Sequence, residues 1–278
     1  MSQPRRIGDA WRQAGRRIDR LDARLLLESV CGVRHAELIA SPERVMAEDE
    51  CLRFDALVAR REAGEPLAYL LGTAWFANLE FAVTPDVLIP RPETELLVEL
   101  AVQKAAGMTC PRIVDLGTGS GIIPVLLAKR CPDAQLTAVD VSPAALRVAR
   151  ANAERHGASI RFLGGDWFSP LHGERFDVIL SNPPYVAAGD PHLSRDGLPF
   201  EPQGALTDGV SGGDGTACLA AIVAGAPAHL AAGGWLLMEH GYDQAVKVRE
   251  MLCAAGFSAL ASWRDEAGIE RVSGGRLP

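Results

Sequence analysis

The first segment that could do chemistry is the glycine-rich run at 115–121, which reads Asp-Leu-Gly-Thr-Gly-Ser-Gly. It lies between a predicted strand, 113–116, and a helix predicted to continue through Lys129. In doubly wound sheets, ligands bind where a strand leads into a helix in this way, and glycine lets the backbone approach a ligand closely. Asp140 ends the next predicted strand, where its carboxylate can accept hydrogen bonds from ribose hydroxyls. These residues predict a site for a nucleoside-bearing cofactor.

The spacing of the glycines distinguishes between kinds of nucleoside cofactor. The dinucleotide fingerprint Gly-x-Gly-x-x-Gly fails, because its third glycine would fall on Ile122 or on Pro124. A loop of the form Asp-x-Gly-x-Gly-x-Gly, which has no pyrophosphate to hold, fits S-adenosylmethionine (SAM) better. A nicotinamide-type site and a plain tight turn with a surface aspartate are the alternatives.

The second segment is 177–185, an apolar predicted strand that ends in Asn182-Pro183-Pro184-Tyr185. Proline has no backbone N–H and a fixed φ. Asn182 then offers a side-chain carbonyl and Pro183 a backbone carbonyl as acceptors, and an aromatic ring follows. Two acceptors and a ring suit an NH₂ group on a planar system. The alternative is a proline turn that only ends a strand.

Together the two motifs resemble those of class I SAM-dependent methyltransferases with an (Asp/Asn/Ser)-Pro-Pro-(Tyr/Phe/Trp) motif, which methylate planar nitrogens. More narrowly, the chain is similar to the PrmC (HemK) family. Its members methylate the side-chain nitrogen of glutamine in the Gly-Gly-Gln motif of bacterial class I peptide chain release factors. The discriminating stretch is 87–95, Val-Leu-Ile-Pro-Arg-Pro-Glu-Thr-Glu. Further matches are Glu201-Pro202, Ala205-Leu206, Gly213-Asp214-Gly215, Glu239-His240-Gly241 and the tail from Asp265 to Arg271.

The resemblance covers nearly the whole chain and implies its fold class. That fold is α/β and Rossmann-like, with a mainly parallel seven-stranded sheet, a terminal antiparallel hairpin and a small helical N-terminal domain. Two positions depart from the family pattern. Asn78 stands where the family usually has a glycine in a hairpin, and Pro124 lies inside the helix after the glycine loop. Because Pro124 falls in the first turn, where proline is tolerated, we expect no loss of function.

The resemblance also implies a role for each site residue, with SAM as the cofactor, S-adenosylhomocysteine as its product and no metal. The residues implied to bind SAM are Gly117, Thr118, Gly119, Ser120, Gly121, Asp140, Asp166, Trp167 and Asn182. Those implied to form the glutamine pocket and its wall are Asn182, Pro183, Pro184, Tyr185, Arg91, Glu93 and Thr94. The implied catalytic residues are Asn182, Pro183 and Tyr185. Trp167 could instead be a core aromatic, and Glu93 a helix cap.

Three other functions are compatible with parts of these motifs. A DNA adenine methyltransferase uses the same motif on a flipped base, but the acidic composition and the lack of an evident target-recognition domain disfavour it. A ribosomal-protein glutamine methyltransferase of the PrmB type fits the chemistry, but Arg91-Pro92-Glu93 disfavours it, since Arg-Ser-Pro is typical there. A non-catalytic binding module would need neither motif intact.

The elements that must position these residues begin with a helical region. Apolar residues recur at helical spacing over 5–62, and Ser41-Pro42 resembles the start of one of these helices. Aromatic and apolar residues on both sides of Asn78 predict a short hairpin. This part of the chain is therefore predicted to be a small helical domain followed by a hairpin.

From residue 111 onward, predicted strands alternate with helices, as in a mainly parallel sheet with helices on both faces. Residues 257–273 predict a terminal hairpin, and 186–214 reads as a functional loop rather than a linker. The expected domains are a helical substrate-docking domain at 1–70, a hairpin linker at 71–90 and a methyltransferase domain at 91–278.

Composition limits the partners and the compartment. The net charge of −7 argues against a dedicated nucleic-acid binder. The six cysteines are scattered, which indicates reduced thiols of a cytosolic protein, and scattered histidines suggest no metal site. No apolar run is long enough to span a membrane. We therefore expect a cytoplasmic protein without a membrane or nucleic-acid partner. The resemblance implies a class I release factor as its partner, and we expect a monomer.

One charged region stands apart from this acidic composition. Six arginines lie among the first twenty residues, against two aspartates, and they could meet an acidic face of the partner, solvated helix faces being the alternative. These arginines are Arg5, Arg6, Arg12, Arg16, Arg17 and Arg20.

Overall fold

The computed structural model describes residues 4–278 and divides them into two compact units. The first unit extends to Thr73 and also includes Ser194–Phe200, and the second comprises Ala74–Leu193 and Glu201–Pro278. A short segment from the second half of the chain therefore belongs to the N-terminal unit. The segment 71–90, expected as a hairpin linker, lies mostly within the second unit.

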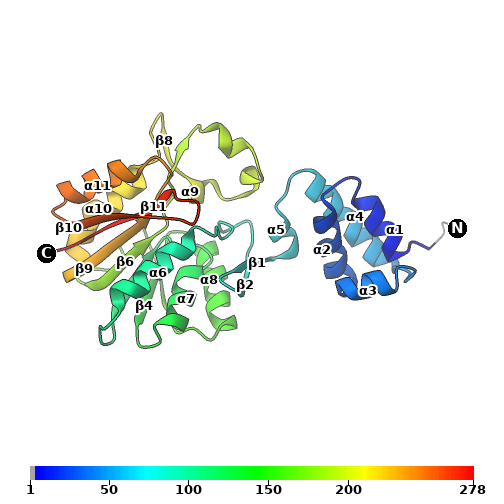
Figure 1. The fold of residues 1–278 in the computed structure, drawn as a ribbon, viewed down its shortest axis with the longest axis horizontal. Helices are drawn as coiled ribbons and strands as arrows, with labels where there is room; N and C mark the ends of the chain where they lie inside the picture. Colours follow the sequence, from blue (N-terminus) through cyan, green and yellow to red (C-terminus); the bar gives the residue numbers. More distant parts are fainter. Residues whose placement is uncertain (1–3) are drawn as a thin grey trace. The chain divides into compact units, whose positions relative to one another are not determined.

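The first unit is helical, as the sequence predicts (Figure 1). Its core is built from apolar residues at helical spacing, among which Leu26, Leu27 and Phe54 are fully buried. The Asp19 carboxylate accepts the Leu21 N–H at 2.7 Å and caps the second helix. The helices are α1 (Ile7–Ala14), α2 (Arg20–Cys31), α3 (His35–Ala40), α4 (Glu48–Glu62) and α5 (Leu67–Leu71).

The prediction that Ser41-Pro42 starts a helix is wrong. The Ser41 N–H closes the end of α3 instead, and the Pro42 carbonyl accepts the Gly8 N–H at 2.9 Å. Helix α4 begins only at Glu48, where the Glu50 carboxylate caps its first turn from within the helix. A tertiary contact with α1 thus overrides the local capping signal.

The predicted hairpin around Asn78 is confirmed as β1 (Thr73–Phe76) and β2 (Leu79–Ala82). Its two turn residues, Ala77 and Asn78, have φ values of 46° and 61°. Positive φ at both positions is what a type I′ turn needs, and asparagine adopts it more readily than most residues. This explains how Asn78 can replace the glycine usual in the family. Phe76 and Phe81 bury this hairpin against the core of the second unit.

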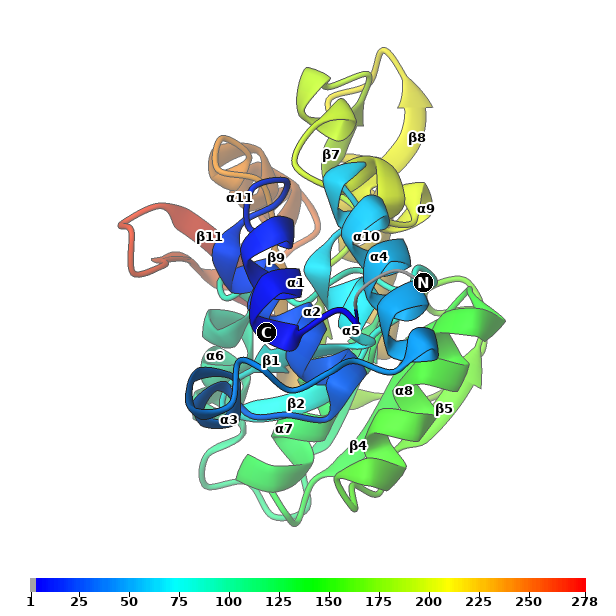
Figure 2. The same ribbon diagram turned by 90° about the vertical axis from the view of Figure 1, so that its right-hand side faces the viewer.

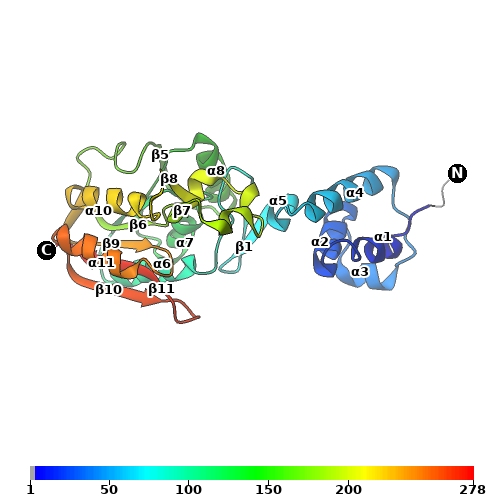
Figure 3. The same cartoon turned by 90° about the horizontal axis from the view of Figure 1, so that it is seen from above.

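The centre of the second unit is the expected seven-stranded sheet, in the order β10-β11-β9-β6-β3-β4-β5. The five strands from β9 to β5 are parallel to their neighbours, while β11 is antiparallel to both β9 and β10, which confirms the terminal hairpin (Figure 3). The strands are β3 (Arg112–Leu116), β4 (Gln135–Asp140), β5 (Arg161–Gly164), β6 (Phe176–Ser181), β9 (Leu230–Glu239), β10 (Ser258–Arg264) and β11 (Glu270–Arg276).

Helices cover both faces of this sheet, because successive strand residues point to opposite faces. Ile113 of β3 packs in the core that α6 and α7 share, whereas its neighbour Val114 packs with α10 and α11. Helix α8 lies beside β4 and β5 (Figure 2). The helices are α6 (Thr94–Ala105), α7 (Ile122–Arg130), α8 (Pro143–Arg155), α10 (Ala217–His229) and α11 (Ala245–Ala254).

The segment expected as a functional loop, 186–214, contains short elements that the sequence did not indicate. Two of them, β7 and β8, pair in parallel as a separate small sheet. The elements are β7 (Val186–Ala188), the 3₁₀ turns η1 (Pro191–Ser194) and η2 (Leu198–Phe200), α9 (Gln203–Leu206) and β8 (Thr207–Ser211). Within residues 4–278, no helix has both the length and the apolar character needed to cross a bilayer.

Candidate active site

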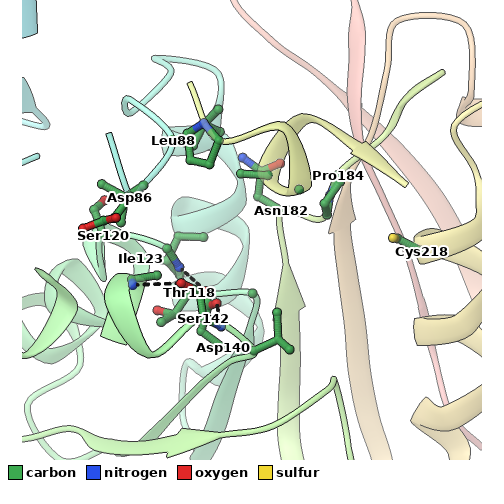
Figure 4. A pocket seen from close by; sticks show the side chains of 18 of the residues that line it. Asp86, Leu88, Thr118, Ser120, Ile123, Asp140, Ser142, Asn182, Pro184 and Cys218 are labelled. Carbon is green, nitrogen blue, oxygen red and sulfur yellow. Dashed lines mark hydrogen bonds between the residues drawn. The ribbon is translucent and has the colours of Figure 1, made fainter. Parts of the chain in front are cut away.

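A cavity of about 510 Å³ opens at the carboxyl ends of β3, β4, β5 and β6 (Figure 4). In the sheet, β3 has β4 on one side and β6 on the other. The order of strands therefore changes direction at β3, and the cavity lies at this switch point. Its volume is in the range of small-molecule sites. The residues expected at the site that line it are Arg91, Thr94, Gly117, Thr118, Gly119, Ser120, Asp140, Asp166, Trp167, Asn182 and Pro184. Those that do not line it are Glu93, Gly121, Pro183 and Tyr185.

Three successive backbone N–H groups of the glycine loop donate to partners within the protein. Those of Gly117 and Thr118 both donate to the Val139 carbonyl, at 2.9 and 3.0 Å. The Gly119 N–H donates to Asp140 Oδ2 at 2.8 Å. A pyrophosphate site needs such N–H groups free to point at the ligand. The loop therefore disfavours a nicotinamide dinucleotide.

Asp140 is fixed by two backbone donors. Its Oδ2 accepts from Gly119 and its Oδ1 accepts the Ser142 N–H at 2.8 Å (Figure 4). Each carboxylate oxygen can accept more than one hydrogen bond. Asp140 lines the cavity, so its remaining acceptor positions are available to the hydroxyls of a ribose.

Asp115 is a buried carboxylate that lacks a partner. Its side chain is fully buried, and neither of its oxygens, nor Oγ1 of neighbouring Thr118, has a hydrogen-bond partner among the described residues. Burial raises the pKa of Asp115 to about 7, although the nearby Thr118 hydroxyl favours the charged form. Asp115 does not itself line the cavity, but Gly117 and Thr118 close to it do. Burying an unpaired carboxylate is costly, so a cationic group of a ligand bound beside these residues would stabilise Asp115. SAM carries an ammonium group on its methionine portion, and the residues present therefore fit SAM.

Trp167 forms one wall of the same cavity. A Cβ added to Gly117 would lie 3.3 Å from Cζ3 of the Trp167 ring, so this ring lies directly against the glycine loop. The ring also packs against the core shared with α10 and α11. Trp167 thus has both the core contact considered as the alternative and a face on the cavity.

Gly121 serves helix packing. It precedes α7 with a φ of 79°, and a Cβ at this position would lie 3.0 Å from Cβ of Ala149 on α8. Only glycine lets α7 and α8 approach this closely in that conformation. The implied contact between Gly121 and SAM remains a prediction.

The Asn-Pro-Pro-Tyr segment begins directly after β6, next to β3 in the sheet. The Asn182 side chain lines the cavity, and its Nδ2 donates to Thr94 Oγ1 at 3.2 Å. Pro183 is buried. The Tyr185 hydroxyl donates to Glu239 Oε1 at 3.2 Å, and its ring packs against the core. Burial is the main cause that raises the pKa of Tyr185.

Glu239 ends β9 and is the functional candidate that sequence reasoning missed. It appeared only as part of the Glu239-His240-Gly241 match, with no role. Thr94 Oγ1 donates to its Oε2 at 2.8 Å, so Glu239 joins Thr94 and Tyr185. Burial raises the pKa of Glu239 to about 7, against the hydrogen bonds from these two hydroxyls. A buried acid at the carboxyl end of a strand was the available signal.

Two further contacts support the walls of the cavity. Glu201 is buried, and its carboxylate accepts from Arg91 at 2.5 Å and from the Ile89 N–H at 3.0 Å. Arg91 is thereby held at the cavity.

Glu93 occupies the N-cap position of α6 without a capping hydrogen bond from its side chain. Across residues 4–278, no three histidine, cysteine or acidic side chains are grouped so that they could hold a metal ion.

Family models match both parts of the chain. The PrmC N-terminal domain matches residues 5–72, and the methyltransferase small domain matches residues 92–194. Among solved structures, a 16S rRNA methyltransferase from T. thermophilus has a TM-score of 0.56, with 20% identity over 74% of this chain and 50% of that chain. A methyltransferase from Pyrococcus furiosus has a TM-score of 0.53, with 20% identity over 78% and 95%. These likenesses show the class I methyltransferase fold.

Curated relatives are much more similar in sequence. A release factor glutamine methyltransferase from Burkholderia pseudomallei is 52% identical over 94% of this chain and 93% of its own length. One of the same name from Bordetella pertussis is 51% identical over 94% and 96%. These matches confirm the resemblance inferred from the motifs, and the chain belongs to the PrmC family of SAM-dependent release factor glutamine methyltransferases.

Proposed function

We propose that this protein transfers the methyl group of SAM to the side-chain amide nitrogen of the glutamine in the Gly-Gly-Gln motif of class I release factors. The observation that carries the proposal is the meeting of two sites in one cavity. The glycine loop with Asp140 suits SAM, and Asn182, with its amide oxygen free of Thr94, faces the same space. Relatives more than half identical carry the name of this activity.

The reaction forms an N–C bond to the methyl group, breaks the S–C bond of the sulfonium and releases a proton from nitrogen. Bound SAM supplies the electrophilic methyl group. The amide nitrogen is a poor nucleophile, because its lone pair is delocalised into the carbonyl. A strong base is not required, because the methylated amide cation loses its proton readily to water or to Asn182.

The protein must therefore supply geometry. Holding the nitrogen in line with the departing sulfur, in a site closed to water, can contribute about 7–11 kcal/mol. Acceptors at Asn182 Oδ1 and the Pro183 carbonyl would bind the two N–H groups and favour the positive charge that develops on nitrogen. Asn182, Pro183 and Tyr185 are the proposed catalytic residues, and Pro184, Arg91 and Glu93 complete the proposed substrate pocket. Of these six, Asn182, Pro184 and Arg91 line the cavity, and the proposal requires the other three to reach the substrate from the segments that adjoin it.

The Gly-Gly-Gln sequence of the proposed substrate suits entry into a cavity. Two residues without side chains let the Gly-Gly-Gln backbone enter a cleft and place its glutamine. The helical domain at 1–70 would dock the rest of the release factor, ahead of the hairpin segment 71–90 and the methyltransferase domain 91–278. A release factor acts in translation, so we place the reaction in the cytoplasm, and we propose a monomer that needs no contact with nucleic acid.

One assay tests this function against its rivals. The enzyme with labelled SAM is offered a release factor, the same factor with glutamine replaced by alanine in Gly-Gly-Gln, duplex DNA and ribosomal proteins. We expect label on the unaltered release factor alone. Label on DNA would indicate an adenine methyltransferase, and label on a ribosomal protein would indicate the PrmB-type activity. Label that survives the glutamine replacement would overturn the proposed acceptor.

A further inference from the structure

The side-chain amide of Asn182 can face the cavity in two ways. One orientation presents the acceptor Oδ1, and the other presents the donor Nδ2. Only the acceptor can bind the N–H of an incoming amide. The choice between them therefore decides whether this residue can act on the substrate, and Asn182 itself does not determine it.

A buried chain of hydrogen bonds makes this choice. Asn182 Nδ2 donates to Thr94 Oγ1 at 3.2 Å, and Thr94 Oγ1 donates to Glu239 Oε2 at 2.8 Å. A hydroxyl has one proton, and an ionised carboxylate can only accept. Thr94 must therefore give its proton to Glu239 and can only accept from Asn182. This directs Nδ2 toward Thr94 and leaves Oδ1 for the cavity.

We propose that Glu239, acting through the Thr94 hydroxyl, is the positioning residue that fixes the orientation of the Asn182 amide and so presents Oδ1 to the substrate nitrogen. The inference rests on the proposed function for the identity of the methyl acceptor. Its hydrogen-bond argument concerns the protein alone. Glu239 does not line the cavity, and it therefore acts without touching the substrate.

Protonation of Glu239 reverses the direction of the two hydrogen bonds that link Glu239, Thr94 and Asn182. A protonated Glu239 can donate to Thr94, which then can donate to Asn182 Oδ1 and turn Nδ2 to the cavity. The pKa of Glu239 lies at about 7, raised mainly by burial and lowered by the Thr94 and Tyr185 hydroxyls. The charged groups that act on it are Glu93, which raises the pKa, and Arg271 on β11, which lowers it.

The kinetic test replaces Thr94. Thr94→Val removes the hydroxyl that links Glu239 to Asn182 and keeps the side-chain volume nearly constant. We expect kcat to fall about ten-fold or more, while KM for the release factor and Kd for SAM change less than about two-fold. Thr94→Ser keeps a hydroxyl and should restore most of kcat. The control is Thr137→Val, a buried threonine of β4 whose hydroxyl accepts from Arg161 instead, and it should leave kcat unchanged. A Thr94→Val enzyme with the kcat of wild type would overturn the proposal.

The second test needs no substrate. The chain has asparagine only at 78, 152 and 182, so labelling with ¹⁵N-asparagine gives three side-chain amide signals, and loss in Asn182→Asp identifies that of Asn182. We expect this signal to shift with pH around about 7 in wild type and Thr94→Ser, and to stop shifting in Glu239→Gln and Thr94→Val. A pH-independent Asn182 signal in the wild type would refute the proposal that Glu239 orients the Asn182 amide through Thr94. Absence of methylation by wild type, with the signal titrating, would instead refute only the proposed function.

Discussion

Asn182 is the residue on which the proposed chemistry depends most. In Asn182→Ala the cavity loses the side-chain acceptor for the substrate N–H, and we expect kcat to fall about 10²–10³-fold, as for loss of one preorganised polar group. Binding of SAM should survive within about ten-fold, because Asp140 and the glycine loop are untouched. Turnover and calorimetric titration measure the two effects. Asn78→Gly, at the hairpin turn, is the control. Methylation by Asn182→Ala at the wild-type rate would show that Asn182 is not a catalytic residue.

Asp115 predicts a pH-dependent affinity for SAM. Its pKa lies at about 7 without ligand, and a cationic group beside it should lower that pKa. SAM binding then releases a proton below pH about 7, so affinity should rise as pH increases toward about 7 and level off above it. Asp115→Asn should bind SAM more weakly and with no pH dependence of this kind.

Calorimetric titration over a pH series measures this affinity. The control is Asp86→Asn, which removes an exposed acid that lines the cavity and should keep the pH dependence. An affinity for SAM that does not change with pH in the wild type would show that Asp115 does not face the cation.

At the scale of elements, the loop after β6 depends on close contact with Gly215. This glycine has a φ of 76°, and a Cβ would lie 2.2 Å from the Tyr185 carbonyl oxygen. Gly215→Ala must displace the Asn-Pro-Pro-Tyr segment, so we expect kcat to fall about ten-fold or more. Gly212→Ala has a similar φ of 70° and no atom within 4 Å, so it controls for backbone strain. Equal kcat for the two variants would show that strain, and not this contact, matters.

Asn152 joins three elements around the glycine loop. Its Oδ1 accepts the Ala82 N–H of β2, and its Nδ2 donates to the carbonyls of Ala82 and Ser120. The side chain is fully buried on α8, so Asn152→Ala leaves three backbone groups unpaired and should cost about 2–4 kcal/mol of unfolding free energy. Urea unfolding measures this, with exposed Gln103→Ala on α6 as control. A loss below that of the control would mean that these groups find other partners.

The elements also show what a sequence pattern can predict. Apolar runs, helical periodicity and turn residues are local signals, and they located the alternation of strands and helices along the chain, the two hairpins and the two cavity motifs. The seven-stranded sheet was implied by the family resemblance. Strands β7 and β8 lack apolar alternation, so no local signal marked them. The bond between Thr94 and Glu239 joins residues 145 positions apart. Such contacts follow only from the packed fold, which is why Glu239 had no predicted role.

At the scale of the whole molecule, the positive charge near the N-terminus is partly offset by acids of the same unit. Three of the arginines near the N-terminus are paired within their own unit, in the pairs Arg5–Asp55, Arg12–Asp9 and Arg17–Glu62. Exposed pairs of this kind contribute little to stability, but they do offset the positive charge. The hypothesis that these arginines meet an acidic partner therefore stays a prediction, to be tested by the KM for the release factor after charge reversal at Arg16 and Arg17.

The acids of the molecule fall into two groups with opposite effects on stability. Ion pairs and hydrogen bonds lower the pKa of five exposed or half-buried acids, so their contribution is present above the unfolded pKa and is lost as pH falls. Burial raises the pKa of Asp115 and Glu239 to about 7. The first group consists of Glu62, Glu174, Asp190, Asp214 and Asp265.

The raised pKa of Glu239 predicts that the pH range in which this residue stabilises the fold differs from the range in which the enzyme is most active. Between pH about 4.5 and 7 the folded protein holds a proton on Glu239 that the unfolded chain has lost, so stability falls as pH rises, by at most about 1.4 kcal/mol per pH unit. Glu239→Gln replaces the carboxyl group by an amide that does not titrate, so this contribution to the pH dependence of stability is lost. Urea unfolding should therefore show wild type losing stability relative to the variant as pH rises toward about 7, and no further above it. A difference that does not change with pH would place the pKa of Glu239 near its unfolded value. Because the proton that stabilises the fold also reverses the amide of Asn182, the enzyme should be most active above the pH at which Glu239 stabilises it.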